Sequence, residues 1–391
     1  MSMTLKAASR LHSGEYSEQA VIEVARSLHE ELGANASLGF VFVTREWRAD
    51  LEETLELIRL HARVPLLVGA CGTGLVGRRV ELENRPGLSV LLLVLPEDSF
   101  NVFTIPESAI EETSAPNHWC THTGLTPDQV RGWAILGNPS FQPLEDWLNQ
   151  FSRDYEAKPV SGGLASAPES DYFLFQDSGL VEDPVIAVAF KPPIFLASFT
   201  SQGCRPIGEP LPITKAEDNF IIEIGNVPAY QALESAFMAV PAEERNNLRN
   251  NLFVGLAVSE YVDEFQRGDF LIRNILGADP QMGALAIGAY PRIGQTIQFQ
   301  IRDAKSAHED LIKTFREKRS FGQSPLATLL FSCAGRGKGL FGVSDHDAVT
   351  LADTIGDVPV AGFFANGEIG PVGKRSYLHG YTASGLIFFS E

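Results

Sequence analysis

The sequence lacks the features that would direct a chain into a membrane or onto a nucleic acid. Its longest apolar run, LSVLLLVLP at 88–96, is far shorter than the roughly 20 residues of a membrane-spanning helix. Basic residues are scarce, because 31 lysines and arginines stand against 49 acidic residues, a formal net charge of −18. A phosphate backbone or an anionic lipid surface repels such a chain. The composition therefore predicts no nucleic-acid partner and no membrane partner.

Cysteine is also rare. The four cysteines lie far apart and form no C-x-x-C pair, so no disulfide framework is indicated. The N-terminal segment MSMTLKAASRLHSGEYSE lacks the continuous apolar core of a signal peptide. Together these absences predict a reduced, cytoplasmic protein.

Glycine-rich turns recur along the chain. The segments GACGTGLVG (69–77) and GFFANGEIG (362–370) carry glycine at the same three places, and each closely follows a Val-Pro. A fainter copy is KPVSGGLAS (158–166). Helical and strand patterns flank each turn, which indicates internal copies of one α/β unit. Chance similarity between glycine-rich turns is the alternative, especially for the fainter copy.

The segment from about 192 to 302 adds alternating strand patterns broken by glycine and proline, as in β-hairpins. This predicts a mixed α/β fold in two pseudo-repeated lobes, with extended, partly antiparallel sheets covered by helices. We expect the boundary near Gly225, which gives lobes at 1–225 and 226–391.

Two G-x-G-x-x-G patterns match the fingerprint of a dinucleotide-binding site, but neither is followed by the sequence that such a site requires. The pattern at 72–77 is not followed by a helix, and the pattern at 337–342 lacks the ribose-binding acid after the next strand. No phosphate-binding loop of the G-K-[ST] type is present either. The sequence therefore predicts no nucleotide cofactor, and we expect none of another kind.

The segment CAGRGKGLFG predicts a site for a small anion. It places Arg336 and Lys338, with Gly335 and Gly337, where a helix begins. Ser344 is the expected N-cap of the following helix, so free N–H groups, the helix dipole and two cations favour a carboxylate or a phosphate. A plain turn with solvated basic residues is the alternative.

A metal site is a weaker possibility in HWCTH. If this segment were a strand, His118, Cys120 and His122 would share one face and could bind a soft metal. Incidental polar residues in a loop are the favoured interpretation.

Two cysteines are candidate nucleophiles. Cys204 precedes Arg205, and a neighbouring cation can lower a thiol pKa. Cys333 is the second candidate. No histidine partner can be assigned, so small structural cysteines are the alternative. Arg205, Arg273, Asp303 and Glu368 also lie next to apolar segments or in glycine-rich turns, where charges either pair or line a pocket.

Several segments resemble the FIST domain family, over nearly the whole chain. The C-terminal part of the domain is similar to FSCAGRG (331–337), VPVAGFFANGEIGPVG (358–373) and LHGYTASGLIFF (378–389). Further resemblance lies in VPLLVGACGTG (64–74), QGCRPIGEPLPIT (202–214) and GDFLIRNILGADP (268–280).

The resemblance implies a small-ligand-binding sensory protein that signals through a protein partner, with an amino-acid-like ligand. FIST domains accompany receptors, kinases or F-box elements, but no sequence remains here for such a module, so we expect a stand-alone domain. The resemblance supplies no catalytic residues, which favours a binding protein over an enzyme. We expect Arg336 to hold the anionic group of the ligand and Asn366 and Glu368 a polar or cationic group, with Arg205 and Arg273 as further candidates. An enzyme using Cys204 or Cys333, and an interaction scaffold without ligand, are the alternatives.

Overall fold

The structure is a computed structural model that describes residues 5–111, 115–248, 251–319 and 322–390 of the 391-residue chain. Its internal contacts divide the chain into two units. Unit 1 comprises Met1–Thr200, Leu311–Leu378 and Thr382–Glu391, and unit 2 comprises Ser201–Asp310 and His379–Tyr381. The boundary expected near Gly225 divides the sequence into two consecutive lobes, whereas these units are discontinuous in sequence. That boundary stays a prediction.

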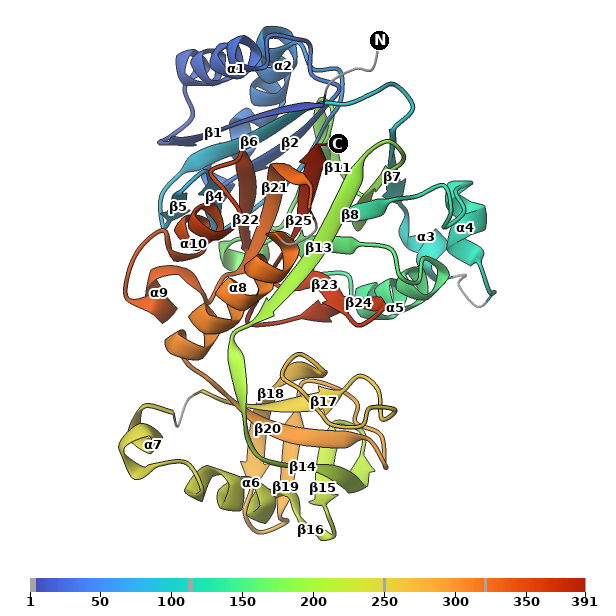
Figure 1. The fold of residues 1–391 in the computed structure, drawn as a ribbon, viewed down its shortest axis with the longest axis vertical. Coiled ribbons are helices and arrows are strands. Elements are labelled where there is room, and N and C mark those ends of the chain that lie inside the picture. Colours follow the sequence, from blue (N-terminus) through green and yellow to red (C-terminus); the bar gives the residue numbers. More distant parts are fainter. Residues whose placement is uncertain (1–4, 112–114, 249–250, 320–321, 391) are drawn as a thin grey trace. The chain divides into compact units, whose positions relative to one another are not determined.

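Unit 1 consists of three copies of one α/β repeat (Figure 1). Each repeat has an outer strand, a helical segment, two parallel strands joined by a second helical segment, a β-hairpin and a final antiparallel strand. Repeat 1 contains β1 (Lys6–Ser13), α1 (Glu18–Leu32), β2 (Leu38–Val43), α2 (Leu51–Ala62), β3 (Leu67–Cys71), β4 (Gly74–Gly77), β5 (Val80–Glu83) and β6 (Gly87–Val94). Repeat 2 contains β7 (Phe100–Ile105), α3 (Glu107–Glu111), α4 (His118–Thr123), β8 (Gly132–Gly137), α5 (Leu144–Asp154), β9 (Val160–Leu164), β10 (Leu174–Gln176), β11 (Gly179–Val181) and β12 (Val185–Phe190).

Repeat 3 has the same order but is interrupted in sequence by unit 2. It contains β13 (Phe195–Gln202), α8 (Ala304–Arg319), β21 (Ser324–Cys333), α9 (Gly337–Phe341), α10 (His346–Thr354), β22 (Val360–Ala365), β23 (Glu368–Val372), β24 (Arg375–His379) and β25 (Thr382–Ser390). The mixed α/β fold and the internal copies expected from the glycine-rich turns are therefore confirmed. The structure adds that the copies number three and lie almost entirely within unit 1.

The three repeats exchange their hairpins in a cycle. Strand β4 of repeat 1 pairs with β22 of repeat 3, β10 of repeat 2 pairs with β3 of repeat 1, and β23 of repeat 3 pairs with β9 of repeat 2. Figure 1 shows β4 and β5 beside β22 accordingly. Because every sheet is completed by a neighbouring repeat, a segment near residue 80 comes to lie against residues after 330. This exchange builds the candidate site described below.

Helices cover the outer faces of these sheets because their apolar residues follow the helical period. In α1, Val21, Ala25 and Leu28 are fully buried at spacings of four and three residues. Figure 1 shows α1 and α2 side by side over the sheet of repeat 1, and all six residues of β2 are buried beneath them. None of the described helices is long and apolar enough to cross a membrane.

One glycine in each repeat allows its two parallel strands to approach. A Cβ added at Gly69, Gly162 or Gly362 would lie 1.9, 1.8 or 1.7 Å from a carbonyl oxygen of the neighbouring parallel strand. These glycines occupy the same place in the pairing register, opposite Val41, Ile135 and Leu330. The glycine alignment made from the sequence thus has a packing cause.

Replacing one of these glycines should destabilise the protein. We expect Gly162→Ala to lower the free energy of unfolding by about 1–3 kcal/mol, because the added methyl group must push β8 and β9 apart. Gly179→Ala is the matched control, since no atom lies within 4 Å of its added Cβ. Urea denaturation of both variants checks this, and equal stabilities would contradict the packing argument.

Unit 2 is an antiparallel sheet that closes on itself. Its strand order is β14-β20-β17-β18-β19-β15-β16, and β14 also pairs with β15. The elements are β14 (Cys204–Glu217), β15 (Phe220–Ile224), β16 (Val227–Pro228), α6 (Ala229–Met238), α7 (Ala242–Leu248), β17 (Leu252–Ala257), β18 (Phe270–Asp279), β19 (Ala284–Ile287) and β20 (Thr296–Arg302). Closure pairs the sheet edges, which would otherwise be open to other chains.

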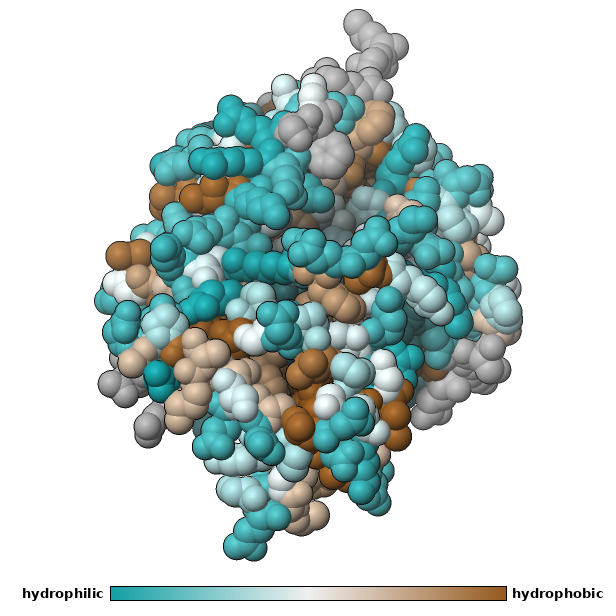
Figure 2. Space-filling model, turned by 60° about the horizontal axis from the view of Figure 1, so that its bottom comes forward, coloured by the Kyte–Doolittle hydropathy of each residue, from teal (hydrophilic) through white to brown (hydrophobic). Residues whose placement is uncertain are grey.

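Unit 2 carries most of the large apolar side chains that remain exposed in the described residues. Figure 2 turns the lower end of the Figure 1 view forward and shows brown, apolar side chains gathered there among polar ones. Tyr261, Tyr290, Met282 and Ile293 are each more than two-thirds exposed. The smaller unit thus presents the more apolar surface.

Candidate functional site

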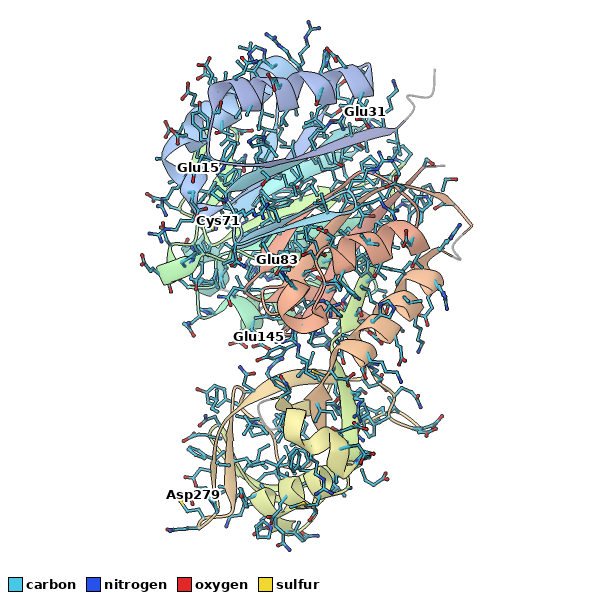
Figure 3. All side chains as sticks on the ribbon, turned by 90° about the vertical axis from the view of Figure 1, so that its left-hand side faces the viewer. Glu15, Glu31, Cys71, Glu83, Glu145 and Asp279 are labelled. Carbon is cyan, nitrogen blue, oxygen red and sulfur yellow. The ribbon has the colours of Figure 1, made fainter. Side chains whose placement is uncertain are left out.

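The candidate site lies in unit 1, where the exchanged β4–β5 hairpin of repeat 1 meets the loop after β21 of repeat 3. A pocket of about 840 Å³ opens there. Figure 3 labels Glu83 of β5 beside the helices that follow β21. The pocket is lined by Leu11, Ser13, Val80, Glu81, Leu82, Glu83, Asn84, Arg85, Ala334, Gly335, Arg336, Lys338, Gly339, Ser344 and Asp345.

Arg336 and Asp347 form a buried ion pair at this pocket. Arg336 Nε and Nη2 donate to the two carboxylate oxygens of Asp347 at 2.6 and 2.9 Å, and both side chains are at most 1% exposed. Ser332 Oγ also donates to Asp347, at 2.9 Å, and His346 Nδ1 lies 2.9 Å from it. Burial alone would raise the pKa of Asp347, but the guanidinium outweighs burial and holds that pKa well below its usual range. The pair is therefore ionised at neutral pH.

Glu81 occupies the N-terminus of α10. Its Oε1 accepts hydrogen bonds from the backbone N–H groups of Asp347 and Ala348 at 2.9 and 3.0 Å. Burial, reinforced by the nearby charge of Asp347, raises the pKa of Glu81 to about 8. Glu81 is therefore largely protonated at neutral pH, although its carboxyl group lies at a helix end that favours an anion.

The expected N-cap is corrected by one residue. Asp345 rather than Ser344 is the N-cap of α10, in a left-handed conformation, and its side chain accepts from Glu81 N–H at 2.7 Å. The helix N–H groups predicted to be free are those that Glu81 engages. Sequence reasoning could not foresee this, because Glu81 and Asp347 are 266 residues apart.

The site keeps unpartnered polar atoms in its interior. Among the described residues that line the pocket, Arg336 Nη1 and Glu81 Oε2 are buried without a hydrogen-bond partner. A buried polar atom left without a partner costs about 1–3 kcal/mol. Native proteins keep few such atoms, and a cluster of them indicates a strained or ligand-accepting place.

The remaining residues of the basic turn have distinct places. Gly335 and Lys338 line the pocket, whereas Gly337 does not. Gly337 adopts a φ of +59°, which favours glycine, and a Cβ there would lie 2.6 Å from Glu83 Oε2 and displace that carboxylate. Glu83 Oε1 accepts from Lys338 N–H at 2.9 Å, which ties the hairpin to the start of α9.

Asn366 and Glu368 do not line this pocket. Glu368 is fully buried, and its Oε2 accepts from Thr382 N–H and Oγ1 at 3.1 and 2.8 Å. Burial raises the pKa of Glu368 to about 7, against the opposing effects of Thr382, Arg336 and Cys333. Asn366 is exposed, and its Nδ2 donates to Tyr172 Oη at 3.3 Å.

The two other predicted arginines lie in unit 2. Arg205 is paired with Asp303 at 3.0 Å and with Glu244 at 2.5 Å, and its side chain is 32% exposed. Arg273 Nη1 donates to the carbonyl oxygen of Ile272 at 3.1 Å. Neither belongs to the set of residues that surround Arg336.

The thiols differ in their surroundings. Cys204 is fully buried against Phe253 and Ile272, which does not suit a reactive nucleophile. Cys71 is also fully buried, and burial raises its pKa to about 12. Cys333 is partly exposed and ends β21, three residues before Arg336.

The histidine segment does not form the strand that the metal-site alternative requires. His118, Cys120 and His122 lie on helix α4, where the two imidazoles are one turn apart and stack with centroids at 6.3 Å. Three residues at alternate positions of a helix do not share a face. In the part of the chain that the structure describes, no group of three or more His, Cys, Asp or Glu residues could hold a metal ion.

Acidic residues of β5 were missed by sequence reasoning. Glu81 and Glu83 stand at alternate positions in VELEN, a spacing that directs both to one side of a short strand. That pattern was visible, but what it faces was not, because the facing loop belongs to another repeat. Asp347 carried no distinguishing signal at the start of its helix.

Comparison with known proteins places the chain in a family. A protein of Mycobacterium tuberculosis described as uncharacterized (Rv0628c) is 34% identical over 377 residues, covering 95% of this chain and 96% of its own. A second uncharacterized protein, from Mycobacterium bovis (Mb0898c), is 33% identical over 382 residues with the same coverage. A crystal structure of cyanuric acid hydrolase from A. caulinodans aligns over 97% of this chain and 98% of its own, at 10% identity and a TM-score of 0.28, which supports no argument.

Family models match most of the sequence in two parts. The FIST N domain model matches residues 37–226, and the FIST C domain model matches residues 229–371. The chain therefore belongs to the FIST domain family of sensory, small-ligand-binding domains.

Proposed function

We propose that the protein binds an amino-acid-like ligand in the pocket beside Arg336 and reports its presence to a protein partner. The supporting observation is that two residues lining one pocket, Arg336 and Glu81, each keep a buried polar atom without a hydrogen-bond partner. A ligand carboxylate would accept from Arg336 Nη1, and a ligand ammonium group would donate to Glu81 Oε2. Such charge-assisted hydrogen bonds are about twice as strong as neutral ones.

The charges around the pocket suit both ends of a zwitterion. Lys338 and Arg85 add positive charge to the lining, and Glu83 and Asp345 add negative charge. In this proposal, Glu81 and Glu83 take the cationic end, which the sequence assigned to Asn366 and Glu368, because the latter two do not line the pocket. Glu368 acts indirectly, through its electrostatic interaction with Arg336.

Occupancy of the pocket would change the protonation of Glu81. An ammonium group beside Glu81 favours the ionised carboxylate, whose pKa would fall from its raised value. The ionised form in turn suits the N-terminus of α10, to which Glu81 is bonded. Ligand binding would thereby tighten the contact between the β4–β5 hairpin and α10, two elements of different repeats.

In this proposal, a protein partner binds an exposed surface of the protein and responds to ligand binding. The exposed tyrosine and methionine side chains of unit 2 belong to the residue types enriched in protein interfaces. Signalling through a partner is thus supported by the apolar surface of unit 2, and the family context of sensory domains agrees with it.

A cysteine-dependent enzyme is the second candidate, and one observation favours it. The thiol of Cys333 interacts with the carboxyl group of Glu368, and Arg336 lies close enough to both for an electrostatic interaction. A carboxyl group could accept the thiol proton, and a guanidinium could stabilise the thiolate. Cys204, the other thiol candidate, is fully buried and is not part of this arrangement.

The proposed function is tested by ligand binding to a variant that keeps the fold. We first screen the common L-amino acids by thermal shift and measure the best ligand by calorimetry. Glu81→Gln keeps the acceptor for the two N–H groups of α10 but replaces Oε2 by a donor. We expect this variant to bind the ligand about tenfold more weakly, since a hydrogen bond to a charged group is lost.

The matched control is Glu30→Gln, an exposed glutamate of α1 outside the pocket. It should bind like the wild type. Undiminished binding by Glu81→Gln, or binding of no amino acid, would contradict the proposal. Modification of Cys333 by iodoacetamide separates the candidates, because a cysteine-dependent enzyme would label there much faster than a free thiol does.

A further inference from the structure

A second pocket in unit 1, of about 430 Å³, is lined by basic side chains. It lies among β13, the second half of α8, the turn between β23 and β24, and the residues before β9. Four of its lining residues are cationic and one is acidic, namely Lys158, Lys318, Lys374, Arg375 and Glu317. It shares no lining residue with the pocket beside Arg336.

This charge is the reverse of the charge of the chain. Acidic residues outnumber basic ones 49 to 31 in the sequence, whereas basic residues outnumber acidic ones four to one in the pocket lining. A concave surface with charges of one sign focuses the electrostatic potential and raises the local concentration of the opposite ion. The pocket therefore attracts anions although the net charge of the chain is negative.

The lining of this pocket also contains buried hydroxyl groups. Thr200 Oγ1 is buried without a hydrogen-bond partner among the described residues, and Thr200 lines the pocket. A Cβ at Gly370 would lie 2.0 Å from this oxygen, so the glycine keeps room for the hydroxyl. Ser198, also in the lining, is 8% exposed.

Lys318 gives the strongest reason for an anion. Its side chain is half-buried on α8, and burial lowers its pKa, while Glu317 opposes this effect. A half-buried ammonium group gains more from a neighbouring anion than an exposed one does, because water screens it less. Lys158, which precedes β9, also lines the pocket, so two lysines from different segments of the chain surround it.

We propose that this pocket binds a phosphate group, either as inorganic phosphate or as a phosphomonoester. Arg375 is paired with Glu156 at 3.6 Å, which leaves three lysines against Glu317 in the lining. The dianionic charge of a phosphate matches this surplus of cations better than a single carboxylate does, and its oxygens can accept from lysine, arginine and hydroxyl donors together. The site is independent of the amino-acid pocket.

The experiment titrates inorganic phosphate and glycerol 3-phosphate into the full chain by calorimetry at low salt, with acetate as the monoanion comparison. The wild type should bind phosphate saturably and more tightly than acetate. Lys318→Gln should weaken phosphate binding about tenfold, because one charge-assisted interaction is lost. Tighter binding of glycerol 3-phosphate than of inorganic phosphate would identify a phosphomonoester as the natural class.

Lys313→Ala is the matched control, since Lys313 is an exposed lysine on the same helix and does not line the pocket. It should leave phosphate binding unchanged. The proposal is overturned if no saturable binding appears below about 10 mM phosphate, a very weak affinity, or if both lysine variants weaken binding equally. Because Lys318→Gln should keep wild-type amino-acid affinity and Glu81→Gln wild-type phosphate affinity, failure of one proposal leaves the other testable.

Discussion

The free energy of unfolding should fall by several kcal/mol as the pH rises from about 5 to about 8.5. Two buried carboxyl groups cause this. Burial raises the pKa of Glu81 from 4.5 to about 8 and that of Glu368 from 4.5 to about 7. Each shift corresponds to a contribution on the order of 3–5 kcal/mol.

The direction follows from the protons bound in each state. Between the unfolded and the folded pKa, the folded protein keeps a proton on each carboxyl group that the unfolded chain has released. Stability therefore decreases with pH in that window. The contribution is fully present below about pH 4.5 and is lost as the pH passes about 7 for Glu368 and about 8 for Glu81.

Urea denaturation across this pH range measures the effect in the wild type and in two variants. Glu81→Gln and Glu368→Gln carry a neutral side chain at every pH, so each should flatten the part of the profile that its own group causes. Glu30→Gln, exposed on α1, should reproduce the wild-type profile. A wild-type stability that rises with pH over this range, or identical slopes in all four proteins, would show that the two carboxyl groups ionise normally.

The repeat architecture could be predicted because its cause is local. Gly69 and Gly362 recur because a Cβ at this one position would overlap a carbonyl oxygen of the neighbouring parallel strand. The same steric constraint acts in every repeat, so glycine stands at the same position of each repeat. The mixed α/β fold was predicted from these glycine-rich turns and from the periodicity of apolar residues in the segments beside them.

Only one part of the site, the basic turn after β21, could be predicted from the sequence. Arg336 and Lys338 stood out because two cations follow a strand in a glycine-rich turn. Their partners come from elsewhere: Glu81 reaches α10 through the exchange of a hairpin between repeats, which no local pattern records. The prediction of free helix N–H groups failed for this reason, since the protein supplies its own carboxyl group where a ligand anion was expected.

Removing one partner of the buried Arg336–Asp347 ion pair should strongly lower the free energy of unfolding. We expect Arg336→Met to lower the free energy of unfolding by about 3–5 kcal/mol, because Asp347 would remain buried as an uncompensated charge. The structure offers a control with the same geometry. Arg78 donates to both carboxylate oxygens of Asp357 at 2.8 Å, but these side chains are 45% and 46% exposed.

Arg78→Met should therefore cost less than about 1 kcal/mol, since water screens an exposed pair and solvates the partner that is left. Replacing both Arg336 and Asp347 by apolar residues should recover part of the loss seen in Arg336→Met, because no unpaired charge stays buried. Urea denaturation of the three variants decides between burial and geometry as the source of the effect. Equal costs at Arg336 and Arg78 would mean that water reaches the Arg336 pocket, in which case Arg336 Nη1 already has a partner and the strongest argument for a ligand there is lost.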